Sequence, residues 1–95
     1  MRETSGEQTG VVLYWRPLCM FCLKLRLRLL FSPRRLTYTK VNIWRDPEAA
    51  AFVRSVANGF ETVPTVTVAG QALVNPSKRQ LMEAVERLAP QALGR

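Results

Sequence analysis

The chain has 95 residues, of which 47% are hydrophobic and 22% are charged, and its net charge is +7. That length supports one domain with a single core and excludes two cores. No uncharged apolar stretch reaches the roughly 18 residues of a membrane-spanning helix, so we expect no membrane partner, and the basic surplus favours acidic partners.

The two ends of the chain are expected to lie outside the domain. Residues 1–10 are polar, contain Glu3 and Glu7, and lack the apolar stretch of a secretory signal. We therefore expect a flexible N-terminal tail over 1–10 and a cytoplasmic protein. The domain itself is predicted over 11–90, with a short C-terminal tail over 91–95.

The first predicted elements are a strand and a helix. Residues 11–15 (VVLYW) are apolar, β-branched and aromatic, as in a buried strand, and Pro17 ends that strand soon afterwards. Residues 20–31 alternate in polarity as a strand would, but leucine, lysine and arginine are strong helix formers. We therefore predict a helix, which Ser32-Pro33 ends.

This helix is expected to have two apolar stripes, one against a sheet and one against a neighbouring helix. The first stripe consists of Leu23, Leu27 and Leu30, and the second of Leu25 and Leu29.

Further along the chain, residues 36–44 alternate with β-branched side chains and predict a second strand. Asp46-Pro47 has the form of a helix start, an N-cap carboxylate followed by proline, and Asn58-Gly59 ends that helix. Residues 65–68 predict a third strand. A turn at 69–71 then leads into a short fourth strand at 72–74, which pairs with the third as a hairpin.

The last helix begins after Asn75-Pro76-Ser77, where Ser77 and Gln80 fit a capping box. Its buried stripe is expected to consist of Leu81, Ala84, Val85 and Leu88. The element order is thus β-α-β-α-β-β-α, an α/β fold with a four-stranded mixed sheet flanked by helices.

The only two cysteines, Cys19 and Cys22, are separated by two residues at the junction of the first strand and the first helix. Unpaired N–H groups and the helix dipole stabilise an anion at such a position, and the thiolate is the reactive form of cysteine. We therefore expect Cys19 to be the attacking nucleophile and Cys22, three residues into the helix, to be the resolving thiol. Arg16 would add a further positive charge.

Other interpretations of the cysteine pair remain. A structural zinc site needs about four ligands, and the chain has no histidine and no further cysteine, so no metal site is predicted. Two buried, inert cysteines are the other alternative.

Thr62-Val63-Pro64 is a second candidate site element. A cis Val63–Pro64 bond would leave the backbone N–H and C=O of Val63 free of the sheet, so that they could pair with a peptide or a tripeptide-like thiol. A plain trans proline at the start of the strand is the simpler alternative, and the low frequency of cis proline favours it.

Together, Cys19-Met20-Phe21-Cys22, Thr62-Val63-Pro64, the first strand and the closing helix resemble the glutaredoxin family of the thioredoxin superfamily. The segments 48–59 and 62–66 and the Asn75-Pro76-Ser77 turn are more narrowly similar to the mycoredoxins of actinobacteria. Those proteins use mycothiol where others use glutathione.

The resemblance implies a thiol–disulfide oxidoreductase with a thioredoxin-like fold and no tightly bound cofactor. Cys19 would take mycothiol, or a glutathione-like thiol, from a protein mixed disulfide, and either a second thiol or Cys22 would release it. The resemblance also implies a cis Val63–Pro64 bond and a thiol co-substrate held by Val63 and Pro64. Its polar part would lie at Asn75 and Ser77, although Ser77 alone is more often a helix cap. Arg16 is also expected to bind the co-substrate.

The sequence departs from the family pattern beside the cysteines. Met20 and Phe21 stand where Pro-Tyr or Gly-Tyr is commoner, and Leu18 stands where the mycoredoxin pattern has tryptophan. These residues make the surroundings of the nucleophile more apolar, and residues of this kind help to set the redox potential.

Basic residues follow the cysteines along the first helix, the next loop and the second strand. They are Lys24, Arg28, Arg34, Arg35, Lys40 and Arg45. A solvated face explains them most simply, and steering of an acidic reductase or protein substrate is the functional alternative. No nucleic-acid-binding motif accompanies the charge, so no nucleic-acid partner is expected.

Two other functions compete with reduction of mixed disulfides. One is a thioredoxin-like electron donor fed by a flavin reductase. The other is a protein that bridges an iron–sulfur cluster between two subunits through Cys19. For the mixed-disulfide reductase itself we expect a monomer.

Overall fold

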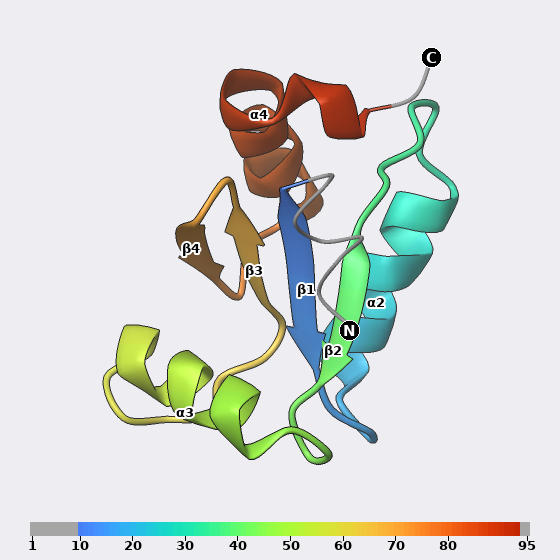
Figure 1. Ribbon diagram of the computed structural model, residues 1–95. Helices are drawn as coiled ribbons and strands as arrows, with labels where there is room; N and C mark the ends of the chain where they lie inside the picture. The colour runs from blue at the N-terminus through green and yellow to red at the C-terminus, as the bar shows by residue number, and fades with distance from the viewer. Residues whose placement is uncertain (1–9, 94–95) are drawn as a thin grey trace.

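The structure of the protein is a computed structural model (Figure 1), of which residues 10–93 are described. Its elements are β1 (Val11–Trp15), α2 (Met20–Leu30), β2 (Thr39–Asn42), α3 (Pro47–Val56), β3 (Thr65–Val68), β4 (Gln71–Val74) and α4 (Lys78–Leu88), followed by a 3-10 helix (Pro90–Ala92). This is the predicted order. The tail predicted over 1–10 lies, except for Gly10, outside the described residues.

The four strands form one mixed sheet in the order β2-β1-β3-β4. β1 runs parallel to β2 and antiparallel to β3, which forms a hairpin with β4. The α/β fold with a four-stranded mixed sheet is therefore confirmed. β2 is shorter than the strand predicted over 36–44, because only residues 39–42 lie opposite the short β1.

Helices cover both faces of the sheet (Figure 1). On one face, Val11 and Leu13 of β1 belong to a core cluster with residues of α2 and α4. Side chains alternate along a strand, so Val12 and Tyr14 point the other way and pack with the buried residues of α3. The carboxyl end of β1 is thereby fixed from both sides, and the loop that follows it carries Cys19.

The packing of α2 differs from the prediction. Leu25 and Leu29 are buried as expected, but the other stripe, Leu23, Leu27 and Leu30, is exposed. The reason is that α4 packs on the same side of α2 as the sheet does, so one stripe contacts both neighbours. The opposite face of α2 is apolar and uncovered.

The domain also extends beyond the boundary predicted at residue 90. Ala92 is buried, and its carbonyl accepts a hydrogen bond of 2.8 Å from the N–H of Thr37. Leu93 forms an isolated bridge with Leu36. Residues 91–93 are therefore part of the fold, where a tail was predicted, because they cover the loop that follows α2.

Candidate active site

Cys19 is the N-cap residue of α2. Its backbone is extended, and its Sγ accepts a hydrogen bond of 3.2 Å from the N–H of Cys22. The position follows from the sequence, because Pro17 cannot continue the sheet and the helix begins at Met20. An N-cap side chain faces the unpaired N–H groups of the first turn, which favour negative charge. The Cys19 sulfur thus lies at the N-terminus of α2, where it accepts a hydrogen bond from the backbone.

Leu18, directly before Cys19, has a left-handed backbone with φ of 66°. For a residue with a Cβ this conformation costs roughly 1–2 kcal/mol. Its side chain is 88% exposed. An apolar side chain beside the thiol is thus exposed to solvent. From the sequence, Leu18 was notable only as a departure from the mycoredoxin pattern.

Cys22 has a different environment. Its side chain is only 2% exposed. Burial is the largest cause that raises the pKa of Cys22 to about 12, and the hydrogen bond with Cys19 adds to it, while the backbone and charge of Arg16 act in the opposite direction. Both cysteines are free thiols. At neutral pH the Cys22 thiol is therefore protonated, and Cys19 is the accessible sulfur of the pair.

The loop before β3 brings Val63 and Pro64 to this sulfur. The Val63–Pro64 peptide bond is cis. The Val63 carbonyl lies 3.7 Å from Cys19 Sγ and accepts its S–H. Within the described part of the chain, the Val63 N–H has no hydrogen-bond partner. A backbone donor is therefore available close to the sulfur.

The Asn75-Pro76-Ser77 turn is tied to the same loop, because the N–H of Asn75 donates to the carbonyl of Pro64 at 2.7 Å. Ser77 forms the predicted capping box with Gln80: its Oγ accepts from the Gln80 N–H at 3.1 Å, and its own N–H donates to Gln80 Oε1 at 3.0 Å. The backbone N–H groups of Asn75 and Ser77 are thus already bonded within the protein. A ligand at this turn could accept hydrogen bonds only from side chains or from the first N–H groups of α4.

A cavity of about 790 Å³ lies between α2 and α4. Asn75 and Ser77 line it, but Cys19, Cys22, Arg16 and Val63 do not, so the predicted binding residues are divided. Its other lining includes Phe21, the four cations Lys24, Arg28, Lys78 and Arg79, and the two carboxylates Glu83 and Glu86.

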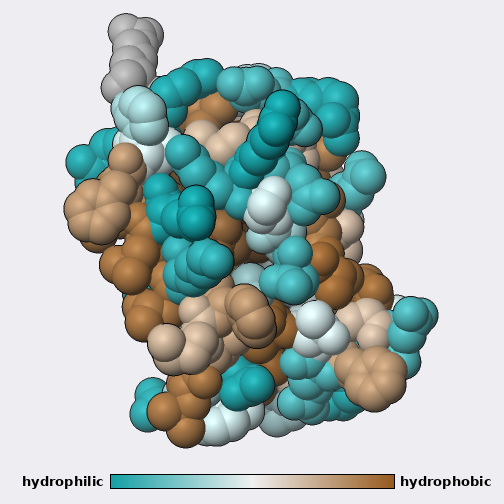
Figure 2. Space-filling model, turned by 180° about the vertical axis from the view of Figure 1, so that it is seen from behind, coloured by the Kyte–Doolittle hydropathy of each residue, from teal (hydrophilic) through white to brown (hydrophobic). Residues whose placement is uncertain are grey.

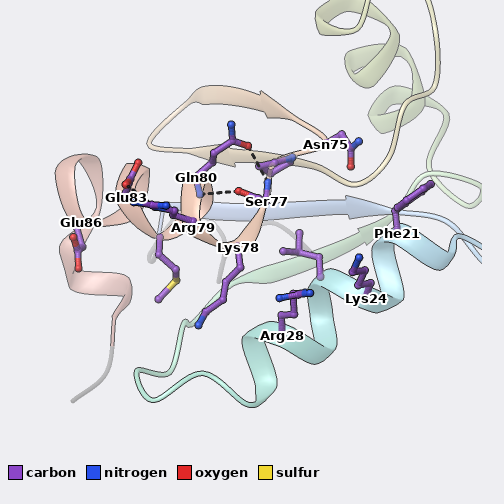
Figure 3. A pocket seen from close by; sticks show the side chains of 13 residues that line it. Phe21, Lys24, Arg28, Asn75, Ser77, Lys78, Arg79, Gln80, Glu83 and Glu86 are labelled. Atoms are coloured by element: carbon purple, nitrogen blue, oxygen red, sulfur yellow. Dashed lines mark hydrogen bonds and ion pairs between the residues drawn. The ribbon is translucent and has the colours of Figure 1, made fainter.

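Figure 3 shows Lys24 and Arg28 on α2 and Lys78 on α4, on the two helices that border the cavity. Among the residues described, none of these three cations has an ion pair, whereas Arg79 pairs with Glu83 at 3.7 Å. Glu86 pairs with Arg34 at 3.2 Å, so the unpaired charges that line the cavity are cationic and favour an anionic ligand. The sequence could not indicate this cluster, because Lys78 is far from the other two in the chain and only the packing of α4 on α2 brings them together.

Arg16 lies apart from this cavity. Its Nη1 donates to the carbonyl of Pro17 at 3.4 Å, and its guanidinium is 5.9 Å from the centre of the Trp44 ring. Trp44 is exposed and pairs with this cation. Within residues 10–93 no group of three or more possible metal ligands occurs, and no helix is long and apolar enough to cross a membrane.

The family model for glutaredoxins matches residues 11–73, which contain both cysteines and the cis proline. This chain belongs to the glutaredoxin family. Proteins of the family are thiol–disulfide oxidoreductases that use a thiol co-substrate such as glutathione, and this glutaredoxin is therefore an enzyme of that class.

Two Mycobacterium tuberculosis proteins named as glutaredoxins, MT3292 of strain CDC 1551 and Rv3198A of strain H37Rv, are each 36% identical to this glutaredoxin over 81 residues. The alignment covers 84% of this chain and 94% of each relative.

Solved structures show the same fold. A crystal structure of a variant of the thioredoxin-like protein BC3987 matches with a TM-score of 0.64 and 17% identity, over 79% of this chain and 97% of that one. The holo form of glutaredoxin C1 from Populus tremula x tremuloides matches with a TM-score of 0.51 and 20% identity, over 90% of this chain and 82% of that one. The thioredoxin-like prediction is confirmed.

Proposed function

We propose that this glutaredoxin reduces mixed disulfides between proteins and a low-molecular-weight thiol of the mycothiol type, with Cys19 as the nucleophile. The observation that carries the proposal is the difference between the two cysteines. Cys19 caps the helix and is partly exposed, while Cys22 is buried and has a pKa raised to about 12. A thiolate is the attacking species, so Cys19 is the thiol suited to attack.

In the first step the Cys19 thiolate attacks the sulfur of the small thiol in a protein mixed disulfide. The old S–S bond breaks, the protein sulfur leaves as a thiolate and takes a proton from water, and a disulfide between Cys19 and the small thiol forms. A second small thiol, as its thiolate, then attacks that disulfide. This step frees the Cys19 thiolate and releases the small thiol as its symmetrical disulfide, so each turnover consumes one free thiol and the other half of that disulfide comes from the substrate.

Cys22 is suited to a secondary role. Burial raises the pKa of Cys22 to about 12, so its side chain stays protonated at pH 7. Its attack on the Cys19 mixed disulfide would require this buried thiol to lose its proton first. We therefore propose that the route through a second external thiol predominates, and that the internal disulfide between Cys19 and Cys22 forms more slowly.

The co-substrate would lie between the cysteine and the cavity. The free N–H of Val63 would bind backbone-like acceptors of the thiol near the sulfur. Its polar part would extend past Asn75 toward the cationic cavity between α2 and α4. Similarity to the Mycobacterium tuberculosis proteins supports mycothiol, the thiol of actinobacteria, as this co-substrate. We further propose that this glutaredoxin is a cytoplasmic monomer and that a flavin disulfide reductase returns the oxidised thiol to its reduced form.

The test is a coupled assay that follows reduction of a mycothiol mixed disulfide by the wild-type protein, Cys22→Ser and Cys19→Ser. We expect Cys22→Ser to retain at least about half of the activity and Cys19→Ser to lose it. Serine is also a good N-cap residue, so Cys19→Ser keeps the helix start and serves as a folded control. The matched glutathione disulfide is expected to turn over more slowly.

Lack of turnover of any mycothiol disulfide by the wild-type protein would rule out the mycothiol proposal. Loss of all activity in Cys22→Ser would instead show that the internal disulfide is required. A brown dimer on purification would favour the iron–sulfur alternative.

A further inference from the structure

The outer face of α2 carries an apolar stripe that nothing in the domain covers. It consists of Met20, Leu23, Leu27, Leu30 and, at the end of the helix, Phe31, which are 70%, 47%, 45%, 66% and 79% exposed. Successive residues of a helix are separated by about 100°, so these positions share the face opposite the buried Leu25 and Leu29. Figure 2 shows hydrophobic side chains gathered along this side of the molecule. Contiguous exposed apolar surface of this kind marks an interaction site.

The stripe begins at the candidate active site. Met20 follows Cys19 directly, and Leu18 extends the apolar surface on the other side of the sulfur. From Met20 to Phe31 the stripe is about 16 Å long, at 1.5 Å per residue. A segment docked along it would therefore end beside the Cys19 thiol.

The borders of the stripe are cationic. Lys24 and Arg28 flank it on one side and Arg26 on the other, and α2 contains no acidic residue. Where the far end of the stripe meets α4, Leu27 and Phe31 line a hollow of about 280 Å³ together with Arg28 and Lys78. An apolar floor beside two cations fits a hydrophobic side chain with a neighbouring carboxylate.

The cationic borders favour one kind of binding partner for the stripe over another. A second copy of this chain would place its own Lys24, Arg26 and Arg28 against the same residues, and like charges across an interface oppose association. A partner with acidic residues beside its apolar ones would be attracted at both borders. The exposed side chains recur at intervals of three and four residues, which matches the spacing of side chains on a second helix.

We propose that the outer face of α2 is the docking surface for an amphipathic, acidic helix of the protein substrate. This inference rests on the proposed function and adds the chemistry of the partner to it. The docked helix would pack its apolar side chains on Leu23, Leu27 and Leu30 and place its carboxylates near Lys24 and Arg28. The cysteine to be reduced would lie at the end of the helix that reaches Cys19.

The experiment uses two synthetic helical peptides of equal length with the same leucine stripe, each carrying one terminal cysteine as a mixed disulfide with mycothiol. One peptide has glutamates beside the stripe and the other has lysines at those positions. We expect the wild-type protein to reduce the acidic peptide with a kcat/KM at least about tenfold higher at low salt. The advantage should shrink in 0.5 M salt, where surface charges are screened.

The matched variants are Leu27→Gln with Leu30→Gln, and Leu27→Met with Leu30→Met. Both positions lie about 12 Å or more along the helix from Cys19, at 1.5 Å per residue, and outside the larger cavity. The glutamine pair should lower kcat/KM for the acidic peptide about tenfold and leave a small mycothiol disulfide within twofold. The methionine pair keeps the apolar surface and should keep the preference.

The outcomes separate the two proposals. If the wild-type protein reduces the small disulfide but reduces both peptides equally, the docking proposal is wrong and the proposed function stands. If it reduces none of them, the proposed function is wrong. Docking is then decided by NMR titration with the disulfide-free acidic peptide, which must shift the amide signals of residues 20–31. A wild-type dimer that the glutamine pair converts to a monomer would assign this face to a second copy and overturn the proposal.

Discussion

The unequal environments of the two cysteines lead to a direct chemical prediction: mild alkylation of the reduced, folded protein should label Cys19 and spare Cys22. With a pKa of about 12, about one Cys22 side chain in 10⁴ is a thiolate at pH 8. An ordinary cysteine, with a pKa of 9.0, is roughly one-tenth ionised at that pH. Because iodoacetamide reacts with the thiolate, Cys22 should react about 10³-fold more slowly than a free cysteine. Burial of its sulfur should slow it further.

The assay treats the wild-type protein with a limiting amount of iodoacetamide at pH 8 and locates the label by tandem mass spectrometry. Cys22 should become labelled only when the protein is first unfolded in guanidinium chloride, in which the two cysteines should react at similar rates. Free N-acetylcysteine provides the reference rate. Labelling of Cys22 at or above the rate of Cys19 in the folded, singly labelled protein would refute the assignment of Cys19 as the accessible thiol.

Three further predictions concern stability. Ser77→Ala removes the capping box of α4 and should lower the free energy of unfolding by about 1 kcal/mol and the Tm by about 4–8 °C. Ser77→Asp can still cap the helix and should keep the wild-type Tm. An unchanged Tm for the alanine variant would contradict the role of the cap. The pKa of Cys22 is higher in the folded protein than its ordinary value of 9.0, so the stability it contributes is complete below about pH 9 and is lost as the pH rises toward 12. When the pH is raised from 8 to 10, the free energy of unfolding, measured by urea titration, should therefore fall by about 1 kcal/mol more in the wild-type protein than in Cys22→Ala. Equal decreases in the two proteins would refute the raised pKa of Cys22. Leu25→Ala, in the core, should lower the free energy of unfolding by about 2–5 kcal/mol. Leu27→Ala, on the outer face of the same helix, should lower it by less than about 1 kcal/mol. Equal losses in the two variants would contradict the orientation of α2.

The order of the elements and their starts could be predicted because they depend on local chemistry. Asp46 before a proline caps α3 by accepting from the Ala49 N–H at 3.1 Å, and Ser77 with Gln80 caps α4, as the spacing of these residues indicates. The position of Cys19 at the start of α2 follows from Pro17 and the helix formers after it in the same way. Such interactions join residues three or four positions apart, so the sequence displays both partners.

Orientation and long-range contacts depended on the tertiary structure. Both leucine stripes of α2 are equally apolar, and only the placement of α4 on the same side as the sheet decided that Leu25 is buried and Leu27 is exposed. The boundary predicted at residue 90 was wrong because Leu93 pairs with Leu36, a contact between distant parts of the chain. The cationic cavity arises in the same way, from Lys24 and Arg28 on one helix and Lys78 on another.

The class of chemistry could be predicted from the sequence, because the groups that stabilise a thiolate at a helix N-terminus belong to its own turn. The difference between the two thiols depends on the packed core. Cys22 is protonated because the core closes around it, whereas Cys19, at the helix start beside the Val63 loop, is only partly buried. Burial is a property of the whole packed chain, and no local pattern of residues fixes it.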